Sequence, residues 1–329
     1  MGNFRRLMVF SGTTNEPLAE EICKELREDH KEDVELGKVN IAKFSNENIS
    51  VQFLETVREA DVFVVQSLYP RPNESLVELM LLCDALRSAS AWRITAVIPH
   101  YSYARSDKKD KPRISIAARL IADVLITAGA NRFLLMTLHS EQVRGFFNVP
   151  TDHLQSTKRI CAEIKKMAEN GEIDLSNTVA LFDLGQDKRR GNFSENLGID
   201  YAVINKHRLK DTEVDIKGDV VGDVKDKDVI MFDDEISSGT SMKAIVKKLT
   251  EQHKVRSVRA VFTHGLFAGN AVKYIEEMPL EQVITTNTVH VPKEKLIDKI
   301  KVISVAPDFA EAINRIHHGQ SIGESGLFD

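Results

Sequence analysis

The sequence predicts an α/β protein with two domains, each built on a mostly parallel sheet flanked by helices. Short apolar runs alternate with segments of helical periodicity along the 329 residues. This alternation indicates parallel strands joined by crossover helices, because a tight turn cannot connect parallel neighbours. The pattern starts again after Pro150, and the length suits two domains. We therefore expect an N-terminal domain over residues 1–152 and a C-terminal domain over residues 153–329.

The first half contains apolar runs that predict strands and amphipathic segments that predict helices. The strands are expected at residues 7–10, 62–66, 94–98 and 133–138. The first helix is expected to follow a cap at Asn73, and the second covers residues 117–128 and ends before Gly129. The apolar stripes of both helices predict faces that pack on the core.

The second half repeats this organisation. A helix is expected around residues 156–169, and a last helical segment spans residues 307–317. Apolar runs predict strands at residues 179–182, 201–204, 229–232, 258–262 and 301–305. The same alternation of elements therefore predicts a second α/β unit.

Composition excludes several classes of function. Lys and Arg total 44 against 49 Asp and Glu, and the net charge of −5 argues against a general nucleic-acid-binding protein. No apolar run approaches the roughly 18 residues of a membrane span, and the first residues lack an apolar signal core. Cys23, Cys83 and Cys161 lie far apart, which indicates buried thiols in a reducing compartment. A cytoplasmic protein that binds neither nucleic acid nor membranes is expected.

The most informative segment follows the apolar run at residues 229–232. Asp233 and Asp234 close this run, and Ser237–Ser241 open an amphipathic segment that ends near Thr250. A strand, a hydroxyl-rich loop and a helix are expected in that order. N–H groups at the helix N-terminus suit a phosphate, and the paired carboxylates suit ribose hydroxyls or a metal ion. A phosphorylated sugar is the predicted ligand, and an ordinary helix-capping turn is the alternative.

Further motifs occur along the chain in a fixed order. They read VIPHYSYARSDKKDKPR at residues 97–113, TLHSEQVRGFF at 137–147, NKHR at 205–208 and THGLFAG at 263–269. Together with the Asp233 loop, they resemble the ribose-phosphate diphosphokinase (phosphoribosyl diphosphate synthase) family over nearly the whole chain. The resemblance implies two phosphoribosyltransferase-like (Rossmann-like) domains. It also implies that the helix at residues 307–317 packs back on the first domain.

By resemblance, Arg105, Ser106 and Asp107 bind ATP. They begin a loop, residues 105–113, that carries five cationic side chains and two Asp. A loop at the C-terminal end of a strand faces the ligand crevice of an α/β sheet, where Arg can bind polyphosphate bidentately. A solvated charge run is the alternative for this stretch.

A second ATP-binding segment departs from the family pattern. Phe44, Asn46 and Asn48 align with a Phe-Ser-Asp-Gly-Glu segment whose aromatic and acidic side chains hold the adenine nucleotide across a subunit boundary. Asn46 and Asn48 replace both carboxylates. Because an amide cannot make the same charged contacts, we expect weaker discrimination between nucleotide bases.

His139 and Asp183 are expected to ligate magnesium, the predicted cofactor, as part of Mg-ATP. Each follows an apolar run, where an α/β enzyme places its ligands. A lone histidine is more often structural, so the role of His139 comes from this position together with the resemblance. Magnesium prefers oxygen, and His139 is therefore expected to act partly through bound water.

Lys206 and Arg208 are the predicted catalytic cations. They alternate with His207 beyond an apolar strand, so they share one side of an extended backbone, and a solvated strand end is the alternative. In the family, this Lys-x-Arg pair lies in a mobile loop and stabilises the transferring diphosphate. The resemblance assigns ribose 5-phosphate to Asp233, Asp234, Ser237, Ser238, Gly239, Thr240 and Ser241.

These residues predict an enzyme that transfers the β,γ-diphosphoryl group of Mg-ATP to the anomeric hydroxyl of ribose 5-phosphate, giving 5-phosphoribosyl 1-diphosphate and AMP. The family implies a homo-oligomer built from dimers, up to a hexamer. Departures at positions 46, 48, 106, 186, 237 and 238 leave open a catalytically weak regulatory subunit that assembles with an active synthase. A third interpretation is a phosphoribosyltransferase that consumes 5-phosphoribosyl 1-diphosphate. The Arg105 loop would have no evident role in such an enzyme.

Overall fold

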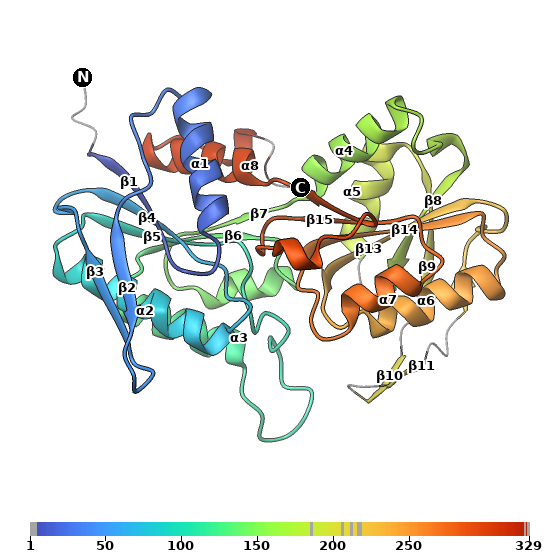
Figure 1. The fold of residues 1–329 in the computed structure, drawn as a ribbon, viewed down its shortest axis with the longest axis horizontal. Coiled ribbons are helices and arrows are strands. Elements are labelled where there is room, and N and C mark those ends of the chain that lie inside the picture. The colour runs from blue at the N-terminus through green and yellow to red at the C-terminus, as the bar shows by residue number, and fades with distance from the viewer. Residues whose placement is uncertain are drawn as a thin grey trace. The chain divides into compact units, whose positions relative to one another are not determined.

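A computed structural model describes residues 5–184, 187–204, 207–210, 213–215, 219–325 and 327 (Figure 1). The chain divides into two units. Unit 1 contains Met1–Gln155, Thr288–His290 and Ser304–Phe328, and unit 2 contains Ser156–Asn287 and Val291–Ile303. Each unit has a largely parallel sheet flanked by helices, which confirms the predicted α/β fold class.

The sheet of unit 1 has five parallel strands in the order β1-β4-β5-β6-β7. Their bounds are Leu7–Ser11, Asp61–Val65, Arg93–Ile98, Arg132–Met136 and Thr151–Leu154. All residues of β1 and β4 are buried, as expected for strands that are covered on both faces. Side chains of β1 alternate between two cores: Leu7 and Val9 join one, and Met8 and Phe10 join the other.

Helices cover both faces of this sheet. α1 (Glu16–Glu28) and α8 (Ala306–His317) pack on one face, and α2 (Pro72–Ser88) and α3 (Ala117–Ala128) pack on the other (Figure 1). A hairpin of β2 (Val39–Lys43) and β3 (Ile49–Phe53) extends the second core, where the ring of Phe53 lies 4.7 Å from that of Phe10. The last long helix of the chain thus completes a core that the first strand begins.

The sheet of unit 2 has the order β12-β9-β8-β13-β14-β15-β16, in which β12 is antiparallel to its neighbour and the other pairs are parallel. In that order, its strands are Val220–Val221, Asp200–Ile204, Thr178–Asp183, Asp228–Ile236, Ser257–Gly265, Gln282–Thr286 and Ile300–Ile303. α4 (Thr157–Glu169) and α5 (Asp187–Leu197) pack on one face, and α6 (Thr240–Glu251) and α7 (Ala271–Glu277) pack on the other.

Smaller elements complete the two units. β10 (His207–Lys210) and β11 (Glu213–Asp215) form a separate antiparallel hairpin. Short 3-10 helices span Glu141–Phe146, Leu175–Asn177, Lys293–Lys295 and Gly323–Ser325.

The strand before the hydroxyl-rich loop is longer than expected. It continues to Ile236, so Asp233 and Asp234 lie within β13 and do not close it. The parallel ladder with β14 runs as far as the pair Ile236 and Gly265. Its backbone hydrogen bonds outweigh the low strand propensity of the two Asp residues.

Other elements had too weak a sequence pattern to be expected. β7 reads Thr-Asp-His-Leu and β15 reads Gln-Val-Ile-Thr-Thr, so neither has the continuous apolar run of a buried parallel strand. Each is nevertheless a strand, because its backbone forms hydrogen bonds with a parallel neighbouring strand. α2 begins at Pro72 with Arg71 as its N-cap, so the cap expected at Asn73 is wrong.

The three cysteines are buried, as expected. Burial raises the pKa of Cys23 and of Cys83 to about 12, so neither thiol ionises at neutral pH. No helix in the described part of the chain combines the length and the apolar character that crossing a membrane requires.

Candidate active site

In unit 2, β13 brings Asp233 and Asp234 toward the carboxyl edge of the sheet. Asp233 is half-buried and Asp234 is buried, because successive side chains of a strand alternate between its faces. Oδ1 of Asp233 accepts a hydrogen bond of 2.9 Å from the backbone N–H of Asp234. The two carboxylates therefore form an asymmetric pair, of which Asp233 is the more accessible.

The loop after β13 is anchored by the loop after β14. Backbone N–H groups of Leu266 and Ala268 donate hydrogen bonds of 2.9 and 3.0 Å to the carbonyls of Ile236 and Ser237. Gly239 has a φ of 74°, a left-handed conformation that favours glycine, and it caps α6. The loop thus leads directly into the N-terminus of α6, where backbone N–H groups carry partial positive charge.

The hydroxyl groups of this loop lie beside the helix terminus. Oγ of Ser238 and Oγ1 of Thr240 are 3.0 Å apart. Ser237, Thr240 and Ser241 are half-buried, and Ser238 is exposed. Hydroxyls and backbone N–H groups in this arrangement form a donor set that suits a phosphate.

Asp183 is the last residue of β8, the strand beside β13. The register of the two strands reaches the pair Leu181 and Met231, so Asp183 and Asp233 follow at the same carboxyl edge. Asp183 is half-buried. Neighbouring strands of unit 2 therefore collect carboxylates at the edge where the hydroxyl-rich loop begins.

In unit 1, the loop between β5 and α3 carries the cationic segment. The hydroxyl of Tyr101 donates a hydrogen bond of 2.8 Å to the carbonyl of Ala118, and the N–H of Ala118 donates one of 3.3 Å to the carbonyl of Ser106. These bonds tie the loop to the first turn of α3. Arg105 is exposed, whereas Ser106 and Asp107 are half-buried.

His139 follows β6 in the same unit. β6 ends at Met136, two residues before the end of the apolar run. The backbone N–H of Leu138 donates a hydrogen bond of 2.8 Å to Nε2 of His153 on β7, which fixes the chain just before the exposed His139. His139 and Asp183 belong to different units, so the expected magnesium ligands are divided between them.

Phe44, Asn46 and Asn48 lie at the tip of the hairpin between β2 and β3. The N–H of Phe44 donates a hydrogen bond of 2.8 Å to the carbonyl of Asn48. The N–H of Asn48 donates one of 3.2 Å to Oδ1 of Asn46, so the Asn46 side chain shapes its own turn. All three residues are exposed.

The predicted catalytic cations belong to a part of unit 2 of which less is described. Lys206 lies outside the described residues, as does position 186, one of the departures from the family pattern. The backbone of Arg208 forms part of β10, opposite Val214 of β11. The catalytic role of Lys206 and Arg208 therefore stays a prediction.

Sequence reasoning missed a polar cluster at the carboxyl ends of β1 and β4. Buried Glu78 of α2 accepts hydrogen bonds of 2.7 and 2.8 Å from the N–H and the hydroxyl of Thr13. It accepts another of 2.7 Å from the side-chain amide of Gln66, whose oxygen accepts one from the hydroxyl of Thr14. A Cβ added at Gly12 would lie 2.4 Å from Oε1 of Gln66. No sequence signal marked its burial, because Glu78 is two residues from both Leu76 and Met80 and so lies off the apolar stripe predicted for this helix.

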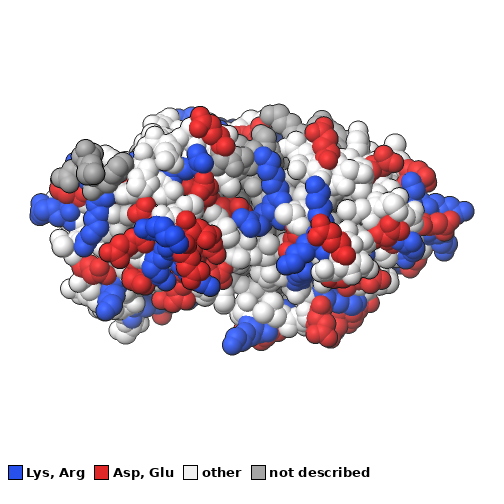
Figure 2. Space-filling view, turned by 90° about the horizontal axis from the view of Figure 1, so that it is seen from above, with Lys and Arg blue, Asp and Glu red and all other residues white. Residues whose placement is uncertain are grey.

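Charged side chains of both signs are mixed on the face drawn in Figure 2. Lys and Arg (blue) alternate with Asp and Glu (red) across it, and the whole chain has a net charge of −5. Binding of nucleic acid depends on a continuous basic surface. The residues drawn in colour on this face form no continuous basic surface of that kind.

The fold and these loops define an α/β protein of the phosphoribosyltransferase type, with a hydroxyl-rich loop leading into a helix and carboxylates at the same sheet edge. The N-terminal domain of ribose phosphate pyrophosphokinase matches residues 7–129, and the phosphoribosyl synthetase-associated domain matches residues 186–328. The chain belongs to the ribose-phosphate pyrophosphokinase family of enzymes. The family expected from the sequence is thus confirmed.

Relatives match the chain over nearly its full length. The ribose-phosphate pyrophosphokinase of Deinococcus radiodurans is 46% identical, over 97% of this chain and 98% of that protein. Ribose-phosphate pyrophosphokinase 2 of Schizosaccharomyces pombe is 40% identical, over 96% of this chain and 96% of that protein. The crystal structure of phosphoribosylpyrophosphate synthetase from Mycobacterium smegmatis is similar with a TM-score of 0.86 and 35% identity, covering 96% of this chain and 100% of that one.

Proposed function

We propose that this protein transfers the β,γ-diphosphoryl group of ATP to the anomeric hydroxyl of ribose 5-phosphate, giving 5-phosphoribosyl 1-diphosphate and AMP. The observation that carries the proposal is the β13–α6 segment, where Asp233 precedes a hydroxyl-rich loop at the start of a 12-residue helix. A helix N-terminus binds phosphate, and a carboxylate near the carboxyl edge of a parallel sheet accepts hydrogen bonds from sugar hydroxyls. Ribose 5-phosphate presents both groups.

In the proposed reaction, the anomeric oxygen forms a bond to the β-phosphorus of ATP. The bond between this phosphorus and the oxygen that bridges to the α-phosphate breaks, and AMP leaves with that oxygen. The proton of the sugar hydroxyl passes to solvent. Because negative charge spreads over the oxygens of the transferring group, positioned cations lower the barrier, and we assign this role to Lys206 and Arg208.

The other predicted residues take binding roles in this proposal. Asp233 and Asp234 engage the ribose hydroxyls, and Ser237–Ser241 hold the 5-phosphate. Arg105, Ser106 and Asp107 bind the triphosphate, with Phe44, Asn46 and Asn48 at the nucleoside. Exposure of Arg105 leaves its guanidinium accessible to a polyphosphate, for which its fork of donors is suited.

Magnesium is proposed to enter the reaction as Mg-ATP. The donors fit a hard cation that prefers oxygen, since Asp183 and Asp233 offer carboxylates on neighbouring strands and the exposed His139 suits contact through water. When bound, magnesium neutralises charge on the triphosphate. His139 and Asp183 are the residues that we expect to hold it.

The deciding experiment incubates the purified protein with ribose 5-phosphate and Mg-ATP and measures AMP, ADP and the sugar products. AMP and 5-phosphoribosyl 1-diphosphate are expected in equal amounts, and chelation of magnesium is expected to stop the reaction. Formation of ADP with ribose 1,5-bisphosphate would show attack on the γ-phosphorus and contradict the proposal.

A regulatory subunit is the second candidate, favoured by the departures at Ser106, Ser237 and Ser238 from the family pattern. Such a protein would release no AMP by itself but would change the rate of an active family member when the two are mixed. For the active enzyme we propose a cytoplasmic homo-oligomer built from dimers, up to a hexamer. Light scattering of the purified protein measures the number of subunits.

A further inference from the structure

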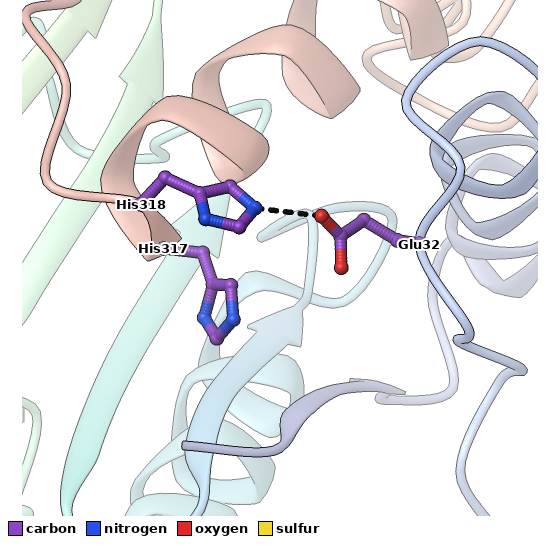
Figure 3. Close-up of side chains that lie close together, drawn as sticks. All are labelled: Glu32, His317 and His318. Atoms are coloured by element: carbon purple, nitrogen blue, oxygen red, sulfur yellow. Dashed lines mark hydrogen bonds and ion pairs between the residues drawn. The ribbon is translucent and has the colours of Figure 1, made fainter. Parts of the chain in front are cut away.

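Two histidines and a glutamate meet at the end of α8 in unit 1. His317 is the last residue of α8 and His318 is its C-cap, while Glu32 lies in the connection after α1. Figure 3 shows the ring of His318 extending toward Glu32, with the ring of His317 below it and directed downward in this view. One potential ligand atom of each residue lies within 4.8 Å of the others. Within the described residues, these side chains form a group of three potential ligands that are close enough together to hold a metal ion.

A second carboxylate orients His317. Nδ1 of His317 lies 2.8 Å from Oδ2 of Asp61, and Nε of Arg93 donates a hydrogen bond of 2.7 Å to Oδ1 of the same carboxylate. The Asp61 side chain is fully buried and that of His317 is 5% exposed. A ring whose Nδ1–H is held by a carboxylate carries its lone pair on Nε2. Histidines that ligate metals commonly donate their other ring N–H to a carboxylate in this way.

His318 and Glu32 are already in contact. Nε2 of His318 lies 2.7 Å from Oε1 of Glu32, and the two histidine rings meet edge to face with their centroids 5.0 Å apart. In a tetrahedral zinc site with bonds near 2.0 Å, ligand atoms are about 3.3 Å apart. The side chains of His318 and Glu32 are 28% and 20% exposed, so they have room for the small rotation that would close the set.

We propose that Glu32, His317 and His318 bind a zinc ion, with water as the fourth ligand. Imidazole nitrogens suit zinc, and two of them with one carboxylate form a recognised zinc-binding set. A cation at this position also lies at the C-terminus of α8, the negative end of the helix dipole, where the carbonyl of Ile316 already accepts a hydrogen bond of 2.9 Å from the Arg93 guanidinium.

The proposed zinc site is separate from the candidate active site of unit 1. Asp61, which orients His317, is the first residue of β4 and lies at the amino edge of the sheet. The Arg105 loop follows β5 at the carboxyl edge. The site therefore joins the end of α8 to the connection after α1, and its expected effect is on stability.

The test uses full-length protein that has been stripped of metal with a chelator and dialysed. Zinc binding is measured by calorimetry, and the melting temperature is followed during a zinc titration. We expect one zinc ion per chain at this site and a rise in melting temperature of about 4 °C or more at 100 times the dissociation constant. Any effect of magnesium at the same concentration is expected to be equal in the parent and in the variants at Glu32 and His318, because the proposed magnesium ligands are His139 and Asp183.

Three variants locate the ion. His318→Gln and Glu32→Gln are each expected to weaken zinc binding at least tenfold, and both positions are partly exposed, so folding should survive. His30→Gln is the matched control, because His30 pairs with Glu311 beside the same helix at 3.5 Å but is not part of the set. Equal zinc binding by all four proteins, or none by the parent, would mean that the contacts are hydrogen bonds only. A loss in His318→Gln without a loss in Glu32→Gln would also overturn the proposed ligand set.

Discussion

Thr13 and Glu78 are joined by two hydrogen bonds, of 2.7 Å from the backbone N–H and 2.8 Å from the hydroxyl of Thr13 to the two oxygens of a buried carboxylate. The contact links α2 to the loop after β1 and so fixes the carboxyl edge of the unit 1 sheet. Because Glu78 also accepts a hydrogen bond from Gln66, its removal deprives three donor groups of this acceptor.

Glu78→Ala is therefore expected to lower the free energy of unfolding by about 2–4 kcal/mol, measured by urea denaturation. Glu74→Ala on the same helix is the control, because Glu74 pairs with Lys43 and Arg71 nearer the surface. Its expected effect is below about 1 kcal/mol. Equal losses in the two variants would show that the contact with Thr13 contributes little.

Acid should weaken unit 2 through Asp228. Hydrogen bonds from Arg256 lower the pKa of Asp228, helped by a bond from Ser257, although burial acts in the opposite direction. Since the folded-state pKa lies below the unfolded value of about 3.9, the carboxylate stabilises the fold above that pH. This stabilisation is lost as the pH falls through the folded-state pKa.

Asp228→Asn is expected to lower the free energy of unfolding by about 1–3 kcal/mol at pH 7. The difference in the free energy of unfolding between Asp228→Asn and the parent should shrink when the denaturation is repeated toward pH 3 and below. The control is Asp223→Asn, because Asp223 is 77% exposed and pairs with Lys227 at 3.1 Å at the surface. We expect Asp223→Asn to have almost no effect at any pH. A deficit in Asp228→Asn that stays constant down to pH 2 would rule out the ionised carboxylate as its cause.

Lys206→Ala and Arg208→Ala should each lower kcat by roughly 10² or more while changing substrate KM less, because a contact made mainly in the transition state affects the chemical step. Steady-state kinetics with varied ATP and ribose 5-phosphate measures both constants. Lys210→Ala, in β10 with Arg208, is the control and should keep most of the activity. If a variant has a raised KM and an unchanged kcat, the cation binds the substrate in the ground state and does not specifically stabilise the transition state.

We expect the tip of the β2–β3 hairpin, which carries Asn46 and Asn48, to determine which nucleotide the enzyme prefers. GTP is expected to support turnover within about tenfold of ATP, a difference of roughly 1.4 kcal/mol. The double change Asn46→Asp with Asn48→Glu should widen the preference for ATP. The turn itself should survive this change, because a carboxylate oxygen can accept the 3.2 Å hydrogen bond that Oδ1 of Asn46 accepts now. The measurement is the ratio of kcat/KM for the two nucleotides.

Glu47→Gln is the control for the hairpin tip, because Glu47 lies in the same turn but pairs with Lys43. It should leave the ratio unchanged. If the parent already rejects GTP by several orders of magnitude, or if the double change has no effect, the base is recognised elsewhere.

Elements buried on both faces could be predicted from the sequence because burial leaves a continuous apolar run, as at residues 62–66 and 229–232. β7 and β15 could not, since their polar residues give no strand pattern and are stabilised by ladders with neighbouring strands of the folded sheet. The Asp233 loop was recognisable because its residues are consecutive. The partners Thr13 and Glu78 are 65 residues apart, and only the folded chain brings them together.

The return of α8 to unit 1 has a consequence for synthesis on the ribosome. Val9 of β1 and Phe309 of α8 share one core, so that core stays open until α8 has been translated. The segments of unit 2 are complete by Ile303, before α8 begins. Domains usually fold in the order in which they are made. Here unit 2 can finish folding before unit 1, because β1 can pack against α8 only after α8 has been synthesised.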